Sequence, residues 1–506
     1  MRDYVAAIDQ GTTGTRCILF DLEGRAAGSA YREHRQIFPQ PGWVEHDPLE
    51  IRERVDEVIF EALRAAPLGR VLAVGITNQR ETVVAWNARD GRPASNAIVW
   101  QDTRTAPECR AAIERGWEAD VRARSGLPIS TYFSATKIRW LLDHVEGVAA
   151  LARSGDLMLG TIDTWVIWSM TGGPRGGAHV TDPTNASRTL LCNLASLEWD
   201  PVLFERFGVP WGTMPQIRPS IAKEPYGFTA ADGPFGARIP VCGNLGDQQA
   251  ALVGQACFAA GEAKNTYGTG SFLLEHVGGK PVSSSFGLLS TAACAGPGEP
   301  AYALEGSVAV SGAAVQWLRD SLGLIASAAE TESIAASVPD AGGVYFVPAF
   351  SGLFAPHWDM QARGAIVGLT RFAQRAHLVR ATLEAICFQS REVAEAMAAD
   401  SGKPLSVLKV DGGASVNDFL MQLQADILGI AAVRPVVSET TALGAAYAAG
   451  LAVGAFESTD ALRRLWKADR TFEPQWNADR RESAFHGWKR AVGRTRGWIE
   501  EGGGQE

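Results

Sequence analysis

Two short apolar runs enclose a polar turn near the N-terminus. Tyr4–Ile8 and Cys17–Phe20 are apolar, and the segment between them, Asp9–Arg16, contains glycines at 11 and 14 and threonines at 12, 13 and 15. Two apolar runs joined by a Gly-bearing polar segment predict a β-hairpin. Because its backbone N–H groups and hydroxyls are not shielded by bulky side chains, this turn suits a phosphate chain.

The same pattern returns about 250 residues later. Ala263–Thr266 leads into Tyr267–Ser271, which contains Gly268, Thr269 and Gly270, and the apolar run Phe272–Leu274 follows. One such hairpin is weak evidence, since many hairpins carry Gly and Thr only for backbone conformation. Two of them, one near the start of each half, predict a duplicated fold that holds a nucleotide from both sides.

Further periodic segments predict strands that alternate with helices, which is typical of an α/β fold. Thr440–Phe456 has no charged residue, but it is short and rich in Gly and Ala, so it predicts a buried helix rather than a membrane span. The expected strands are Val71–Thr77, Ala97–Trp100, Ile239–Cys242, Tyr302–Val310, Val344–Pro348 and Val407–Val410, and the expected helices are Leu49–Ala65, one from Ala135, Ala250–Cys257, Ala313–Leu322, Gln374–Met397 and Phe419–Leu428.

The length of 506 residues exceeds what a single hydrophobic core usually supports, so we expect two large domains, 1–253 and 254–506. A hydrophobic content of 46% and a charged content of 20% are those of a soluble globular protein. The net charge of −9, with no basic cluster, argues against a nucleic-acid partner and favours a small molecule.

The N-terminus lacks the basic and apolar segments of a signal peptide. The seven cysteines are scattered singly, with no CxxC pair, which indicates reduced thiols and no structural zinc. We therefore expect a cytoplasmic protein without membrane insertion. The sequon Asn185-Ala186-Ser187 is interpreted as a chance match.

Polar side chains follow several predicted strands. Arg80 and Glu81 come just after Val71–Thr77, and polar residues at the carboxyl ends of strands are common ligand contacts in α/β sheets. Taken alone, this pair is better explained as a surface ion pair. Trp100 ends the next strand and can form an apolar wall, or simply belong to the core. Tyr132, before the helix from Ala135, can offer its hydroxyl.

Two carboxylates suit phosphoryl transfer. Asp247 stands between a strand and a helix, where it can serve as a general base or as a helix cap. Asp9 would face the phosphates of the first turn, and a carboxylate beside a polyphosphate needs an intervening cation, most simply Mg²⁺.

The second half offers an anion or ribose site. Val407–Val410 runs into Asp411-Gly412-Gly413 and then a helix, so that two glycines lie at an electropositive helix N-terminus. Ser311-Gly312 opens another helix, with Gln316 one turn inside. The chain contains neither GxxxxGK[ST] nor GxGxxG at this position, which excludes P-loop and Rossmann interpretations.

These segments together resemble the FGGY carbohydrate kinases of the actin-like ATPase superfamily. The match covers nearly the whole chain in the same order, so it is far more specific than any single motif. The segments are Asp9–Arg16, Gly75–Thr82 (GITNQRET), Ala97–Thr105 (AIVWQDTRT), Gly246–Gln249, Ala263–Ser271 (AKNTYGTGS), Ala349–Trp358 and Val410–Ala414.

The resemblance implies two actin-like (ribonuclease H-like) domains, each a mixed sheet flanked by helices, with the active site in the cleft between them. It further implies transfer of the γ-phosphoryl group of ATP to glycerol, giving sn-glycerol 3-phosphate and ADP, the first step of glycerol catabolism. Homo-oligomers, dimers or tetramers, are expected. The implied glycerol-binding residues are Arg80, Glu81, Trp100, Tyr132, Asp247, Gln248 and Phe272, with Asp247 as the base. The implied phosphate and nucleotide ligands are Thr12, Thr13, Gly14, Arg16, Thr269, Gly312, Gln316, Gly413 and Asn417, with Asp9 bound to Mg²⁺ through water.

Two alternatives stay open at this point. One is a kinase for another polyol or a ketose, since a pocket changes specificity through one or two side chains. The other is a nucleotide-gated assembly protein that shares the phosphate hairpins. Regulation also stays open: Tyr226–Pro240 contains no His that could be phosphorylated as in some bacterial relatives, and residues 232–236 do not match a fructose 1,6-bisphosphate loop.

Overall fold

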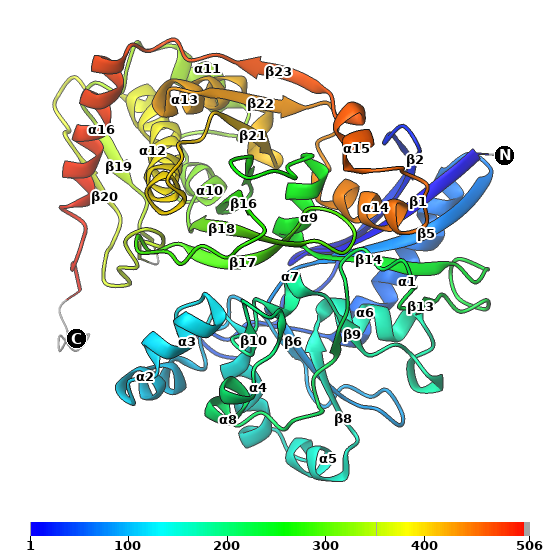
Figure 1. The fold of residues 1–506 in the computed structure, drawn as a ribbon. Helices are drawn as coiled ribbons and strands as arrows, with labels where there is room; N and C mark the ends of the chain where they lie inside the picture. The colour runs from blue at the N-terminus through cyan, green and yellow to red at the C-terminus, as the bar shows by residue number, and fades with distance from the viewer. Residues whose placement is uncertain (1, 351, 500–506) are drawn as a thin grey trace.

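Two large mixed sheets flanked by helices form the molecule, and a smaller lobe extends from the first of them (Figure 1). The structure, a computed structural model, describes residues 2–350 and 352–499. Ser351, within the predicted 349–358 segment, lies outside the described residues. The predicted fold class, mixed sheets flanked by helices, is confirmed.

The first sheet carries the N-terminal hairpin at its centre. β1 and β2 are antiparallel with Asp9 opposite Arg16. β5 lies between β1 and β14 and is parallel to both. The carboxyl ends of these three parallel strands therefore meet at one edge, where ligands bind in open α/β sheets. The strands in spatial order are β13 (Gly227–Phe228), β14 (Pro240–Gly246), β5 (Gly69–Asn78), β1 (Arg2–Gln10), β2 (Gly14–Asp21) and β3 (Ala26–Glu33).

The second sheet repeats this arrangement. β15 and β16 form an antiparallel hairpin, β18 continues it, and β21 and β22 extend it in parallel on the other side. The duplicated fold predicted from the two hairpins is thus present in the strand order. The strands in spatial order are β17 (Leu289–Cys294), β18 (Pro300–Val308), β16 (Ser271–Gly278), β15 (Ala263–Tyr267), β21 (Val407–Asp411), β22 (Ala431–Pro435) and β23 (Ala468–Phe472).

The smaller lobe is built on a four-stranded sheet and has a hydrophobic core of its own, to which Val83, Ile98, Phe133 and Leu159 belong. Its strands are β4 (Glu45–His46), β7 (Ala97–Ile98), β6 (Val83–Asn87) and β8 (Leu157–Thr161). Three short strand pairs complete the described sheets: β10 (Cys192–Asn193) with β11 (Glu198–Trp199), β9 (Val180–Thr181) with β12 (Gln216–Ile217), and β19 (Tyr345–Val347) with β20 (Ala365–Val367).

The helices of the first half begin with α1, which is capped by the Asp47 side chain and has a proline in its first turn. They are α1 (Pro48–Ala65), α2 (Ala106–Glu114), α3 (Glu118–Ser125), α4 (Ser134–His144), α5 (Val148–Ser154), α6 (Ile162–Met170), η1 (Gly173–Arg175), α7 (Pro183–Ala186), α8 (Pro201–Phe207) and α9 (Asp247–Gly254). Those of the second half are α10 (Gly312–Asp320), α11 (Glu330–Ala336), α12 (Arg375–Ser401), η2 (Gly413–Val416), α13 (Asp418–Leu428), α14 (Thr440–Ala452), α15 (Thr459–Leu465) and α16 (Ala478–Val492).

Helix α14 crosses from the second half to pack against the first sheet and α9. Glycines permit direct backbone contact here: a Cβ on Gly75 would lie 2.0 Å from the carbonyl oxygen of Ala445, and one on Gly444 would lie 1.8 Å from that of Ala250. The Gly- and Ala-rich composition of 440–456 thus serves close packing, as predicted. Because α14 joins the first core, the boundary at 253/254 stays a prediction.

Other local predictions have clear outcomes. The strand predicted for Ile239–Cys242 continues to Gly246, and the following helix begins at Asp247 rather than Ala250. All seven cysteines are free and buried, as the reduced-thiol interpretation requires. Asn185 is fully buried, with its amide bonded to Asp182 and Asn78, so the sequon is structural. No described helix is long and apolar enough to cross a membrane.

Candidate active site

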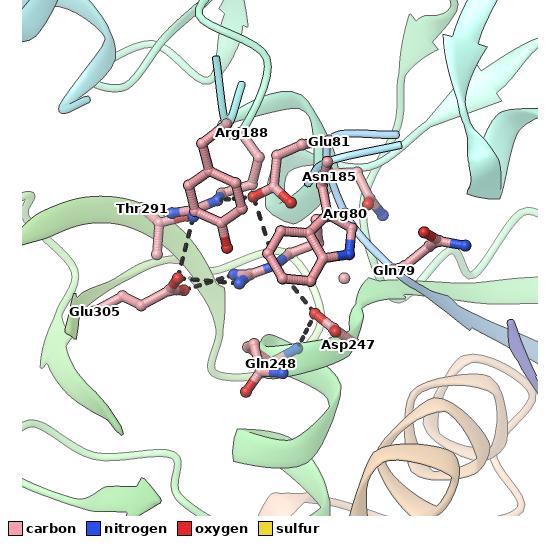
Figure 2. A network of polar contacts seen from close by, with 12 residues as sticks. Gln79, Arg80, Glu81, Asn185, Arg188, Asp247, Gln248, Thr291 and Glu305 are labelled. Atoms are coloured by element: carbon pink, nitrogen blue, oxygen red, sulfur yellow. Dashed lines mark hydrogen bonds and ion pairs between the residues drawn. The ribbon is translucent and has the colours of Figure 1, made fainter. Parts of the chain in front are cut away.

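Arg80 and Asp247 meet at the shared edge of the first sheet. Arg80 follows the carboxyl end of β5, and Asp247 follows that of the neighbouring parallel strand β14. The Nε of Arg80 lies 3.0 Å from Oδ1 of Asp247, and Figure 2 shows the arginine between this carboxylate and Glu305. The strand order thus brings together two charges that are far apart in sequence.

Glu81 occupies a tight turn beside them. The N–H of Thr82 donates to the carbonyl of Arg80 at 2.7 Å, and Glu81 between them has φ of 62°. This is a γ-turn with positive φ, a conformation that costs about 1–3 kcal/mol for a non-glycine residue. This backbone conformation places the Glu81 carboxylate 3.8 Å from Arg80 Nε and 2.7 Å from Arg188 Nε.

Two charged residues that the sequence predictions missed complete this network. Glu305, on β18 of the second sheet, accepts from both terminal nitrogens of Arg80 at 2.6 and 3.0 Å. Arg188, just after α7, donates to Glu305 at 3.1 Å. Burial raises the pKa of the Glu305 carboxyl, but the guanidiniums of Arg188 and Arg80 outweigh it and lower that pKa to about 2. Burial raises the pKa of Glu81, against the effect of the same two arginines.

The exposure of these groups differs sharply. The side chains of Arg80, Glu81, Arg188 and Glu305 are at most 2% exposed, whereas that of Asp247 is 31% exposed. Asp247 is the first residue of α9, and Gly246 occupies the cap position, so Asp247 is not the side-chain cap of this helix. Its carboxylate is therefore held by Arg80 on one side and accessible on the other.

Aromatic side chains border this network on the first half. The indole N–H of Trp100 donates to Thr12 Oγ1 at 2.9 Å, and the Trp100 and Tyr132 rings lie 5.5 Å apart. Burial raises the pKa of Tyr132, so its hydroxyl stays protonated and able to donate. The predicted substrate wall and phosphate turn are thus in direct contact through Trp100 and Thr12.

Gln248 and Phe272 lie toward the second half. The Oε1 of Gln248 accepts from Nζ of Lys264, a fully buried residue of β15 that also donates to Thr266 Oγ1 at 2.8 Å. Burial lowers the pKa of Lys264 to about 8. Since its oxygen is used, Gln248 has its amide N–H donors left for a ligand. Phe272, on β16, is partly buried against Leu252 and Leu274.

The first phosphate turn is narrower than the predicted Asp9–Arg16, because β1 ends at Gln10 and β2 begins at Gly14. Thr12 is half-buried and Thr13 is exposed at its tip. A Cβ on Gly14 would lie 2.6 Å from the Tyr31 hydroxyl, so only glycine fits there. Arg16 forms an ion pair with Glu439, next to α14.

Asp9 is the predicted metal-binding carboxylate. Burial raises its pKa to about 7, with Arg16 acting in the opposite direction and Asp247 and Glu439 adding to the rise. Within residues 2–350 and 352–499, no three His, Cys, Asp or Glu side chains are grouped to hold a metal by themselves. A cation here would therefore need further ligands, such as phosphate oxygens and water.

The predicted nucleotide contacts of the second half lie on two helix starts. Gly312 donates its N–H to the carbonyl of Gly268 at 3.0 Å, which places the start of α10 directly on the second hairpin turn. Thr269, at that turn, and Gln316, one turn into α10, are both exposed. The other two contacts are Gly413, the first residue of η2, and Asn417, the cap of α13.

Gly413 is exposed, with nothing within 4 Å of an added Cβ. Asn417 caps α13 by accepting from Leu420 N–H at 2.9 Å and donates to Thr331 at 3.0 Å. The side-chain amide of Asn417 is thus engaged in hydrogen bonds within the protein, where it serves as a helix cap. A separate cavity of about 280 Å³, between α1, α6 and residues 229–235, is lined by none of the predicted site residues.

The fold and the site define the class of protein. The N-terminal domain model of the FGGY family of carbohydrate kinases matches residues 4–254, and the C-terminal domain model of that family matches residues 263–453. The chain belongs to the FGGY family of carbohydrate kinases, and the resemblance inferred from its motifs is confirmed.

Particular relatives are more specific than the family. The chain is 58% identical over 504 residues to the glycerol kinase of Mycolicibacterium gilvum, covering 99% of this chain and 100% of that protein. The crystal structure of Plasmodium falciparum glycerol kinase with ADP superposes with a TM-score of 0.91 at 37% identity, covering 98% of each chain. Xylulose kinase from Lactobacillus acidophilus, at 24% identity and a TM-score of 0.86 over 97% of each chain, shares the fold.

Proposed function

We propose that this chain phosphorylates glycerol, transferring the γ-phosphoryl group of ATP to give sn-glycerol 3-phosphate and ADP. The observation that carries the proposal is the convergence of Arg80, Glu81 and Asp247 at the edge of the first sheet. Glycerol offers three hydroxyls and little apolar surface, so its recognition requires buried polar partners that a wrong ligand leaves unpaired. The high identity to glycerol kinases over the full chain supports the same substrate.

Asp247 acts as the general base in this proposal. Its carboxylate is the accessible member of the charged network, and Arg80 holds it by an ion pair of 3.0 Å. It would accept the proton of the terminal glycerol hydroxyl as that oxygen forms its bond to the γ-phosphorus and ADP leaves. Tyr132 and Gln248 would donate to the remaining hydroxyls, while Trp100 and Phe272 would cover the carbon atoms.

The phosphate groups would lie between the two hairpin turns. Thr12, Thr13, Gly14 and Arg16 would contact them from the first half, and Thr269, Gly312, Gln316, Gly413 and Asn417 would bind the nucleotide from the second. Asp9 fits a magnesium site, because burial raises its pKa to about 7 and a bound cation would stabilise the charged form of its carboxylate. The ion would neutralise phosphate charge, and Asp9 would hold it through water.

In this proposal, residues 1–253 bind glycerol and phosphate, and residues 254–506 bind the nucleotide. Water competes with glycerol as a nucleophile, so we expect the halves to close on substrate before transfer. A homo-oligomeric state and a cytoplasmic location remain part of the proposal. Light scattering after size-exclusion chromatography measures the molar mass in solution and so tests the oligomeric state.

ADP release tests the proposed reaction. The purified protein is assayed with Mg-ATP and glycerol, with Mg-ATP alone, and with dihydroxyacetone, erythritol and a set of pentuloses. We expect strong stimulation by glycerol and slow hydrolysis without it, and phosphorus NMR to identify glycerol 3-phosphate. Stimulation by a ketose but not by glycerol would replace the proposal with a ketose kinase.

A further inference from the structure

Glu305 joins the two halves at the charged network. It lies on β18 of the second sheet, yet its carboxylate binds Arg80 and Arg188, which both come from the first half. The two contacts to Arg80 form a fork, with Oε2 to Nη1 at 2.6 Å and Oε1 to Nη2 at 3.0 Å. Paired contacts of this kind fix the guanidinium in orientation as well as in position.

Four members of the network are buried, and their charges balance. Two guanidiniums, of Arg80 and Arg188, alternate with two carboxylates, of Glu81 and Glu305, and none of the four side chains is more than 2% exposed. A buried charge is tolerated only with a charged, hydrogen-bonded partner. Removing the Glu305 charge therefore leaves the terminal nitrogens of Arg80 and one terminal nitrogen of Arg188 without their carboxylate partner beside the proposed substrate.

The hydrogen bonds of Arg80 show what Glu305 controls. Of the guanidinium N–H groups, two donate to Glu305 and one to Gln249 Oε1 at 3.2 Å, while Nε faces Asp247 at 3.0 Å. One N–H of Nη2 has no partner among the described residues and is left for a ligand. The direction of that N–H is fixed by the plane of the guanidinium, and the two contacts to Glu305, drawn as dashed lines in Figure 2, set this plane.

We propose that Glu305 is a positioning residue for the glycerol site, which sets the plane of the Arg80 guanidinium from the second half and so makes glycerol binding depend on contact between the halves. This inference rests on the proposed glycerol phosphorylation. Glu305 does not touch the reacting atoms; it acts through Arg80. Its loss should therefore weaken glycerol binding selectively, since Glu305 contacts none of the proposed nucleotide-binding residues through its carboxylate.

The variant Glu305→Gln tests this proposal, because it keeps the shape but replaces one acceptor oxygen by an amide that faces an arginine donor. We expect the glycerol KM to rise about 10- to 100-fold, the ATP KM to stay within about twofold, and kcat to fall less than the glycerol kcat/KM. Glu384→Gln is the matched control: Glu384 is a buried glutamate bonded to Arg380 Nε at 2.9 Å, remote from the site. It should leave both KM values unchanged.

Calorimetric titration with glycerol alone gives a readout independent of turnover, and thermal unfolding verifies that each variant is folded. Arg188→Lys keeps the charge but loses the pair of nitrogens that donate to Glu81 and to Glu305, and should show the same selective effect to a smaller extent. Equal rises in both KM values, or an unchanged glycerol KM in the folded variants, would overturn the positioning role. If wild-type protein releases no ADP in response to glycerol, the proposed function fails instead, and the two failures are thereby distinguished.

Discussion

Gly246→Ala tests whether the position of Arg80 limits catalysis. Gly246 ends β14, with φ of −59° and ψ of 149°, so its backbone conformation is open to any residue. An added Cβ would lie 2.7 Å from Cδ and 2.8 Å from Cγ of Arg80, and 3.0 Å from Oε1 of Gln249. The substitution therefore acts through contact with the Arg80 stem and not through backbone strain.

The size of the effect follows from these distances. Carbon atoms pack at roughly 3.5–4.0 Å, so the Arg80 stem must move by about 1 Å. The guanidinium is held at 2.6 to 3.0 Å by Glu305 and Asp247, and a shift of this size breaks or bends at least one of those bonds. A misplacement of about 1 Å typically costs about 100-fold in rate, equivalent to ~2.7 kcal/mol of transition-state stabilisation.

The assay compares glycerol-dependent ADP release by Gly246→Ala with that by Gly493→Ala. Gly493 also has φ of −59°, but an added Cβ would meet its nearest atom at 3.5 Å, an ordinary contact. We expect about a 100-fold loss of kcat/KM for glycerol in the first variant and full activity in the second. A folded Gly246→Ala protein with activity within about threefold of wild type would refute the proposed dependence on Arg80.

Three further predictions concern other parts of the molecule. Asp247→Asn should abolish turnover while calorimetry still detects glycerol binding, because the geometry survives without the proton acceptor; near-normal turnover would remove Asp247 from the role of base. Asp9→Asn should inactivate the protein yet raise its melting temperature in the absence of metal, and the rise should be larger at pH 8 than at pH 5. The reason is that the pKa of Asp9 is raised from 3.8 to about 7 in the native state, so the native state loses stability as the pH rises through that window. A change in melting temperature that does not depend on pH would contradict this. Gly444→Ala should lower the free energy of unfolding measured in urea, because its Cβ would lie 1.8 Å from the Ala250 carbonyl oxygen; an unchanged midpoint would show that α14 can shift away from α9.

The hairpins and the strand-end residues were predictable because their signals are local. Apolar runs on either side of a Gly–Thr turn predict a hairpin, and Arg80 and Asp247 each follow a segment predicted to be a strand. That they meet at 3.0 Å depends on β5 and β14 being parallel neighbours, which the structure shows and the sequence does not predict. The end of β14 was misplaced because Gly243 and Gly246 look like turn residues, whereas they serve close packing against α14 and Arg80.

Glu305 and Arg188 could not be placed from the sequence, since their partners lie more than 100 residues away and in another sheet. A weaker signal was present: Glu305 interrupts the apolar strand predicted at Tyr302–Val310, and a charge at a buried strand position must have a partner. The pattern indicates that a partner exists but not which one. Only the packing of β18 against the first half selects Arg80, and this makes the second sheet a part of the proposed glycerol site.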